Sequence, residues 1–122
     1  MEKLVHAGKA KAIGVSNFSK AEMERLLKNS SIVPAAHQLE LHPWLQQSAF
    51  IDYLKGKGIH VTQYSSLGNQ NEVYTGRETI GRLIDDSTIT TLAQKYGKSP
   101  AQIALGKSYF CLPQQYETDL TS

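Results

Sequence analysis

The sequence predicts an α/β fold in which about three parallel strands are separated by helices. Three short apolar runs, at residues 12–16, 36–41 and 59–64, have the length and composition of strands. The segments between them have helical periodicity and are longer than the two-residue turns that join antiparallel strands. Strands connected through helices pair in parallel with right-handed crossovers, so the expected order is strand, helix, strand, helix, strand.

A complete helix-start signal follows the first strand. Ser19 and Glu22 have the spacing of a capping box, in which the hydroxyl and the carboxylate each satisfy a backbone N–H. The helix is therefore expected to start at Lys20. Its buried stripe is expected to comprise Met23, Leu26 and Leu27, and the Asn-Ser-Ser run at residues 29–31 is expected to end it.

The remaining helices are predicted from their apolar stripes and their ends. Phe50, Ile51 and Leu54 form the stripe of a second helix that Gly56 or Gly58 can terminate. A long loop is expected over residues 65–84. A helix is expected between the Asp-Asp-Ser run at 85–87 and Gly97, and another begins with the Ser-Pro-Ala-Gln run at 99–102.

Polar side chains gather where the predicted strands end. Ser16 and Asn17 close the first strand, and strand alternation sets Gln38 and Glu40 on one face of the second. Ligands of parallel sheets bind at the carboxyl ends of the strands, because the loops there converge without disturbing the core. Taken alone, Ser16 and Asn17 fit a strand that runs into a helix cap better than they fit a ligand site.

Three segments of the chain resemble motifs of the aldo-keto reductase family. They read Gly-Lys-Ala-Lys-Ala-Ile-Gly-Val-Ser-Asn-Phe at 8–18, Ala-Ala-His-Gln-Leu-Glu-Leu-His-Pro at 35–43 and Ile-His-Val-Thr-Gln-Tyr-Ser-Ser-Leu-Gly at 59–68. The family motifs run Gly-Lys-x-Arg-x-Ile-Gly-Val-Ser-Asn-Phe, Asn-Gln-x-Glu-x-His-Pro and Tyr-Ser-Pro-Leu-Gly at similar separations. The resemblance covers residues 1–105, and residues 106–122 are expected to be a divergent tail.

The resemblance implies a partial (β/α)₈ TIM barrel. A complete barrel needs about 250 residues, whereas this chain has 122. Residues 1–5 look like the middle of a helix, and in the family this stretch follows an earlier half of the barrel. Met1 is therefore expected to be an internal methionine that serves as a start, through truncation, alternative splicing or an incomplete gene prediction.

The resemblance also implies a nicotinamide cofactor, NADPH in this family, and the residues that hold it. It assigns the ring carboxamide to Ser16, Asn17 and Gln38, the ring face to Tyr64, and the pyrophosphate to Ser65, Leu67 and Gly68. Two positions depart from the family pattern. His37 stands where many members have asparagine, and Ser66 stands where the third motif has proline.

No residue of the chain is nominated as catalytic. The family acid is a tyrosine supported by a lysine and an aspartate, with a histidine nearby, all from the first half of the barrel. The Ile-Pro-Lys-Ser segment and later arginine that grip the adenosine 2′-phosphate are also not found, so NADPH rests on the resemblance alone. No metal site is expected, because no His-Glu-x-x-His or paired-cysteine spacing occurs.

Net charge, apolar run length and cysteine count limit the kinds of partner and the cellular setting that we expect for this chain. A net charge of +2 from 13 basic and 11 acidic residues is too balanced for a nucleic-acid or anionic-membrane surface. No apolar run reaches the length of a transmembrane helix. The single cysteine fits a reducing, cytoplasmic setting. The partner that the resemblance implies is a small-molecule carbonyl substrate of the complete enzyme.

The resemblance implies a fragment of an NADPH-dependent reductase of aldehydes and ketones, and we expect this fragment to be inactive alone. Two alternatives stay open. The chain could be a non-catalytic interaction fragment that pairs through open strand edges, with itself or with a full-length homologue. It could also be a truncated product without function.

Overall fold

The computed structural model describes residues 1–68 and 81–111 of the chain. These residues fall into two compact units. The first comprises Met1–Glu40 and Gln47–Tyr64, and the second comprises Leu41–Gln46 with the residues from Ser65 onward. The predicted α/β class with three parallel strands is confirmed, and all three strands belong to the first unit.

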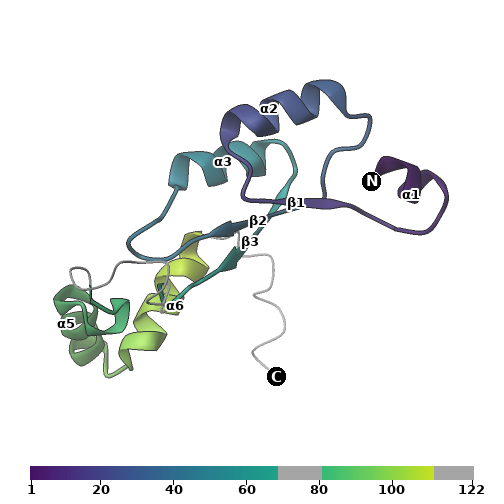
Figure 1. Cartoon of the computed structure of the whole chain (residues 1–122). Coiled ribbons are helices and arrows are strands. Elements are labelled where there is room, and N and C mark those ends of the chain that lie inside the picture. Colours follow the sequence, from purple (N-terminus) through teal and green to yellow (C-terminus); the bar gives the residue numbers. More distant parts are fainter. Residues whose placement is uncertain (69–80, 112–122) are drawn as a thin grey trace. The chain divides into compact units, whose positions relative to one another are not determined.

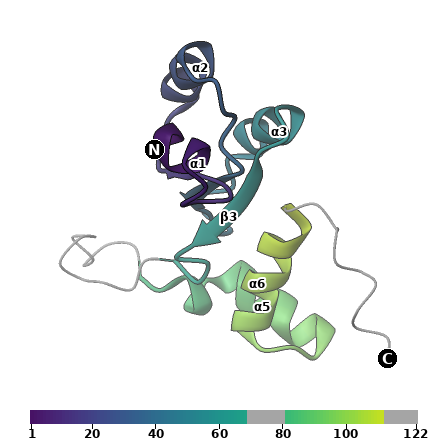
Figure 2. The same cartoon turned by 90° about the vertical axis from the view of Figure 1, so that its right-hand side faces the viewer.

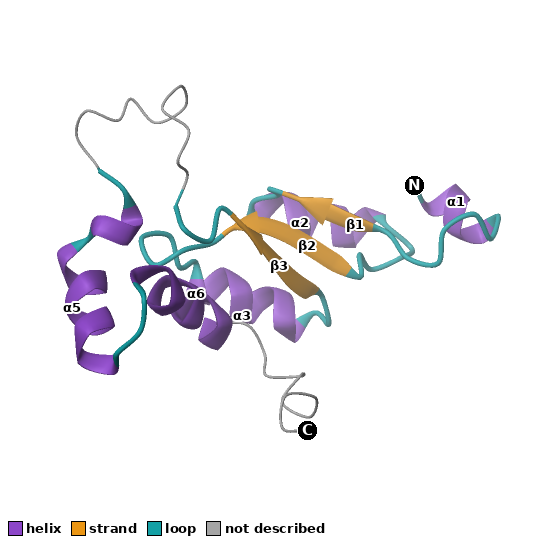
Figure 3. Ribbon diagram, turned by 90° about the horizontal axis from the view of Figure 1, so that it is seen from below, coloured by secondary structure: helices purple, strands orange, loops and turns teal. Residues whose placement is uncertain are grey.

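The three strands form one parallel sheet in the order β1-β2-β3 (Figure 3). They span Gly14–Ser16, Ala36–Glu40 and His60–Tyr64. The first strand is shorter than predicted, since only three residues pair with β2. A glycine is required at its start, because a Cβ atom at Gly14 would lie 2.9 Å from the carbonyl oxygen of Ala36.

Helix α2 spans Lys20–Asn29 and begins where the capping box predicts. The Glu22 N–H donates to Ser19 Oγ at 3.3 Å, and the Ser19 N–H donates to Glu22 Oε2 at 2.8 Å. These bonds satisfy two backbone donors that a helix start otherwise leaves without a partner. The Ser19 hydroxyl and N–H also lower the pKa of the Glu22 carboxyl.

Helix α3 spans Ser48–Gly56, and Gly58 makes the turn that leads from its end to β3. Gly58 has a φ of 72°, a conformation that favours glycine, and the following Ile59 N–H donates to the Leu54 carbonyl at 3.0 Å. Of the two glycines predicted to end this helix, Gly58 therefore makes the left-handed turn. Gly56 is the last residue of the helix itself.

Helices α2 and α3 lie together on one side of the sheet (Figure 1). The side chains that pack between these helices and the sheet form the core of the first unit. This core contains Met23, Leu39, Ile51, Leu54, Ile59 and Val61, together with His37. Seven side chains make a small core, so each contributes a sizeable part of the hydrophobic stabilisation.

A short helix, α1, spans Glu2–His6 and anchors the connection between α2 and β2. Glu2 accepts hydrogen bonds from the Ser30 hydroxyl and from the N–H groups of Ser31 and Ile32, the latter two at 2.8 and 3.1 Å. Helical character at residues 1–5 was expected, whereas these contacts with a turn about thirty residues away follow from no local pattern.

Among the described residues of the second unit are a 3₁₀ helix, η1, and the α-helices α5 and α6, of which Figure 2 labels the two α-helices. The 3₁₀ helix η1 spans Leu83–Asp85 and occupies the end of the predicted loop, of which residues 69–80 lie outside the described part. Helix α5 spans Ser87–Tyr96 between Asp86 and Gly97, as predicted. Helix α6 spans Pro100–Cys111 and so continues through the predicted boundary at 105/106.

Asp86 connects the start of α5 to Trp44. Its Oδ1 accepts from the Thr88 N–H at 2.8 Å, and its Oδ2 accepts from the Trp44 indole N–H at 3.1 Å. The Trp44 bond, followed by the backbone N–H bonds, lowers the pKa of Asp86. One carboxylate therefore both caps a helix and holds an indole ring.

The contacts of Glu2 generate a prediction about acid stability. The Ser30 hydroxyl, followed by the backbone N–H bonds, lowers the pKa of Glu2 from 4.5 to about 2. A carboxylate with a depressed folded pKa stabilises the fold fully above pH 4.5, and this contribution is lost as pH falls toward 2. The Glu2→Gln variant should therefore be less stable than the parent at pH 7, with the difference shrinking at acid pH.

The measurement is urea unfolding followed by circular dichroism between pH 2 and 7, the range set by this pKa shift. Glu24→Gln is the matched control, because its carboxylate lies 3.8 Å from the Lys20 ammonium on an exposed surface. A constant difference between Glu2→Gln and the parent across this range would contradict the prediction.

Candidate functional site

The parallel register places predicted site residues in one row across the sheet. Ser16 pairs with Gln38, and Gln38 pairs with Thr62. Gln38 is exposed, whereas its neighbours His37 and Leu39 are buried on the side that the helices cover. Because registered residues of a sheet point to the same face, Ser16, Gln38 and Thr62 share the face away from α2 and α3.

The predicted pair at the end of β1 is fixed by one carbonyl group of β2. The Ser16 hydroxyl donates to the Gln38 carbonyl oxygen at 3.1 Å, and the Asn17 N–H donates to the same oxygen at 2.9 Å. Asn17 has a φ of 57°, in the left-handed region that asparagine tolerates better than most residues. The chain therefore leaves the sheet at Asn17 with Ser16 held beside Gln38.

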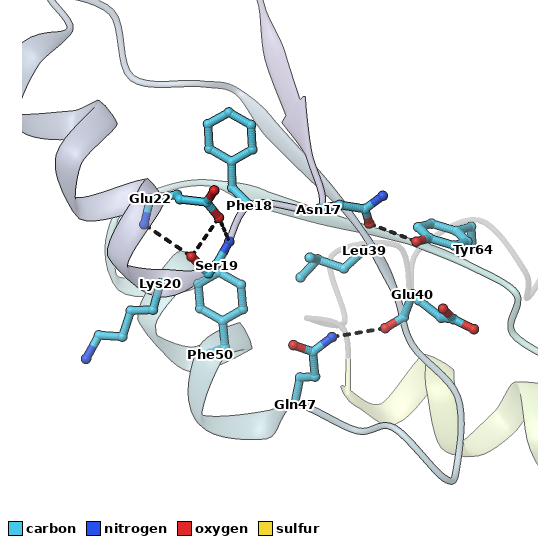
Figure 4. A pocket seen from close by; sticks show the side chains of 10 residues that line it. All are labelled: Asn17, Phe18, Ser19, Lys20, Glu22, Leu39, Glu40, Gln47, Phe50 and Tyr64. Atoms are coloured by element: carbon cyan, nitrogen blue, oxygen red, sulfur yellow. Dashed lines mark hydrogen bonds between the residues drawn. The ribbon is translucent and has the colours of Figure 1, made fainter.

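Tyr64 joins the end of β3 to the end of β1. Its hydroxyl donates to Asn17 Oδ1 at 2.8 Å, as Figure 4 shows. With its oxygen engaged in this way, the Asn17 amide presents its N–H donors. Four of the predicted cofactor residues are thus brought together: Ser16, Asn17 and Tyr64 at the carboxyl ends of β1 and β3, and Gln38 in the middle of β2 as the register partner of Ser16.

A pocket of about 530 Å³ opens at this end of the sheet, beside the N-termini of α2 and α3 (Figure 4). Asn17 and Tyr64 line it, whereas Ser16 and Gln38 do not. Lys20 also lines it, but its ammonium is 3.8 Å from Glu24 and 5.2 Å from the Tyr53 ring centroid. This cation is therefore already engaged by neighbouring side chains.

Gln47 forms the part of the pocket wall next to α3. It has a φ of 48°, and its Nε2 donates to the Glu40 carbonyl oxygen at 3.1 Å. A glutamine in the left-handed region is strained, and this hydrogen bond holds it there. Sequence reasoning did not single out Gln47 or Thr62. Thr62 could have been found, because it lies two residues before Tyr64 on the same strand face.

The other predicted cofactor residues belong to the second unit, where they form a tight turn. The Gly68 N–H donates to the Ser65 carbonyl at 2.8 Å, and both residues have positive φ values, 76° and 52°. A Cβ atom at Gly68 would lie 3.1 Å from Leu83 Cβ, so glycine is favoured by space as well as by conformation. Leu67, between them, is half-buried.

Two further observations bear on the class of site. Within residues 1–68 and 81–111, no group of three or more His, Cys, Asp or Glu side chains is placed to hold a metal ion. No helix in the described part of the chain has the length and apolar character needed to cross a membrane.

Comparison with known proteins shows which family the chain matches. The model of the aldo/keto reductase family matches residues 1–109. This match includes all seven residues to which cofactor roles were assigned. It also extends a few residues beyond the boundary predicted at 105/106.

Individual relatives of the chain are named as oxidoreductases or reductases, in agreement with the family match. An uncharacterised oxidoreductase of Schizosaccharomyces pombe is 43% identical over 109 residues, covering 89% of this chain and 33% of the relative. The aldose reductase of Encephalitozoon cuniculi is 47% identical, covering 86% of this chain and 33% of the relative. The NAD(P)H-dependent D-xylose reductase of Scheffersomyces stipitis is 46% identical, covering 86% and 34%. The chain spans about a third of the length of these curated relatives.

The bond between Tyr64 and Asn17 generates a prediction about stability. Tyr64→Phe should lower the free energy of unfolding by about 0.5–1 kcal/mol, the lower part of the usual range, because the bond is solvent-exposed. Urea unfolding followed by circular dichroism measures the loss, and the NMR signal of the Asn17 side-chain amide should shift. Tyr96→Phe controls for removal of a hydroxyl from a 59% exposed tyrosine. Equal effects of the two substitutions would show that the bond contributes nothing.

Proposed function

The chain belongs to the aldo/keto reductase family, and on this premise we propose that its residues form part of the nicotinamide-binding wall of an NADPH-dependent oxidoreductase. The proposed reaction is the reduction of aldehydes and ketones to alcohols. When bound, the cofactor supplies the hydride for this reaction. The protein must hold the ring rigidly, fix the rotation of its carboxamide and exclude other orientations.

The observation that supports this proposal most strongly is the arrangement of Ser16 and Asn17 around the backbone carbonyl oxygen of Gln38. A carboxamide has one acceptor oxygen and one donor NH₂ group, so it needs donors and acceptors side by side. In the proposal, the Asn17 amide N–H groups donate to the carboxamide oxygen. The Ser16 oxygen and the Gln38 amide oxygen accept from its NH₂ group, and Tyr64 packs on the ring face.

The cofactor's identity and the pyrophosphate contacts extend the proposal. Relatives are named as NAD(P)H-dependent and NADPH-dependent D-xylose reductases, which supports a nicotinamide cofactor. NADPH is proposed over NADH on family grounds. The Ser65–Gly68 turn is proposed to lie along the pyrophosphate, where Gly68 allows close approach. The Gly68 N–H is already used within the turn, so the contribution of this residue is proposed to be steric.

The proposed substrate is the carbonyl group of a small molecule. Aldose and xylose reductases among the relatives favour the aldehyde of an open-chain sugar. The single cysteine supports a reducing, cytoplasmic setting as part of the same proposal. Residues 106–122 are still proposed to be a divergent tail, with its start inside α6.

We further propose that the 122 residues alone do not catalyse turnover, because none of the tyrosines whose side chains the structure describes, Tyr53, Tyr64 and Tyr96, has the surroundings of a proton donor. The Tyr64 hydroxyl bonds an amide, not a lysine. Tyr53 and Tyr96 have lysine ammonium groups over their ring faces, at 5.2 and 5.3 Å from the centroids. A lysine that supports an acidic tyrosine must instead approach the hydroxyl oxygen.

A second candidate function is association through the edges of the sheet. Within the described residues, β1 and β3 each pair on one side with β2 and have no strand on the other. Such edges carry N–H and C=O groups that can bind another strand. Co-purification with a full-length reductase of the family would favour this function over the cofactor-binding one.

Cofactor affinity tests the main proposal. The parent chain should bind NADPH, detected by isothermal titration calorimetry and by a rise in the thermal unfolding midpoint. Gln38→Ala should weaken binding about fivefold to tenfold, because each hydrogen bond contributes about 1 kcal/mol. Gln94→Ala, at an exposed glutamine of α5, is the matched control and should leave affinity unchanged. A parent chain that does not bind NADPH or NADH would refute the proposal.

Turnover tests the proposed inactivity. The purified parent chain, mixed with NADPH and a reactive aromatic aldehyde, should oxidise no more NADPH than a mock preparation from the same host. The physical reason is the missing proton donor, without which hydride transfer leaves a charged alkoxide. Activity that follows the chain through purification and falls in Gln38→Ala would contradict this prediction.

A further inference from the structure

His37 contacts the turn at residues 16–18, which carries two of the three predicted carboxamide residues, Ser16 and Asn17. It is 0% exposed, on the side of β2 that faces the helices. The rings of Phe18 and Phe50 meet it edge-on, with centroids 6.4 and 5.6 Å from its own. A histidine at a fully buried position needs a polar partner to offset the loss of water.

That partner is the backbone of the turn. The Phe18 N–H donates to His37 Nε2 at 3.0 Å. A ring nitrogen that accepts a hydrogen bond carries no proton, so the neutral ring must carry its proton on Nδ1. Burial lowers the pKa of His37, which favours the neutral ring. The Nδ1 atom is buried without a hydrogen-bond partner among the described residues. One N–H donor of the buried ring is therefore unsatisfied, which costs free energy of folding.

The position of this bond in the turn gives it a second consequence. The Asn17 N–H is held by the Gln38 carbonyl, and the next N–H, that of Phe18, is held by the His37 ring. Two consecutive residues of β2 thus fix two consecutive N–H groups of the turn. Between these bonds the backbone passes through the left-handed conformation of Asn17, where unsupported chain would relax.

We propose that His37 is a positioning residue of the nicotinamide site, in which Nε2 holds the Phe18 N–H and so fixes the backbone that presents Ser16 and Asn17 to the cofactor carboxamide. This inference rests on the proposed function. The contribution of His37 is the acceptor atom, not the volume of the ring. Aromatic packing against Phe18 and Phe50 is the competing explanation, and it requires no acceptor.

A matched pair of substitutions separates the two explanations. His37→Gln can place an amide oxygen near the position of Nε2, whereas His37→Met has a similar length without a strong acceptor. Val61→Ala is the packing control, because Val61 is the buried register partner of His37 on β3. Each variant is measured for NADPH affinity by calorimetry, for unfolding free energy, and for hydrogen exchange of the Phe18 amide by NMR.

The inference predicts that His37→Met weakens NADPH binding about tenfold and speeds exchange of the Phe18 amide. His37→Gln should stay within about threefold of the parent in affinity. Val61→Ala should lose stability with little change in affinity. An NMR titration of the ¹⁵N-labelled parent should also find the proton of His37 on Nδ1, a readout that needs no variant to fold.

The outcomes distinguish this inference from the proposed function. Equal affinities of His37→Met and the parent, or a proton on Nε2, would overturn the positioning role and leave the nicotinamide site intact. Losses of affinity that follow stability in all three variants would assign His37 to packing. A parent chain that binds no nicotinamide cofactor would overturn both proposals.

Discussion

The parallel register of three strands is the constraint on which the rest of the described site depends. It aligns Ser16, Gln38 and Thr62 in one row and brings the ends of β1 and β3 close enough for the bond between Tyr64 and Asn17. A shift of one residue in any strand would send its polar side chains to the helix-covered face. The register is in turn protected by Gly14, since a side chain there would strike the Ala36 carbonyl.

Strand β2 serves two purposes with neighbouring residues. Gln38 faces outward with an exposed amide, while His37 faces inward and is fully buried. Both nevertheless bind the same turn, one through its carbonyl oxygen and the other through its ring. A residue of the core and a residue of the exposed face therefore act on one segment of backbone, which links the packing of the helices to the geometry of the sheet edge.

Local patterns predicted most of the secondary structure, because caps and apolar stripes act within a few residues. The start of α2 at Lys20 and the limits of α5 followed from such signals. The contacts of Glu2 with Ser30 and Ile32 could not be predicted, since they join residues that are distant in sequence. The motifs indicated which residues of the site share an end of the sheet, whereas the roles of the Gln38 carbonyl and the His37 ring required the register.

Trp44 is the single tryptophan of the chain, and its indole binds Asp86 within the second unit. The sheet and its polar row belong to the first unit, whose aromatic side chains are phenylalanine, tyrosine and histidine. Intrinsic fluorescence excited at the indole band therefore reports on the unit that lacks the sheet. A denaturation curve recorded in this way describes the surroundings of Trp44 and of the start of α5, and it leaves the unfolding of the sheet to be followed by another signal.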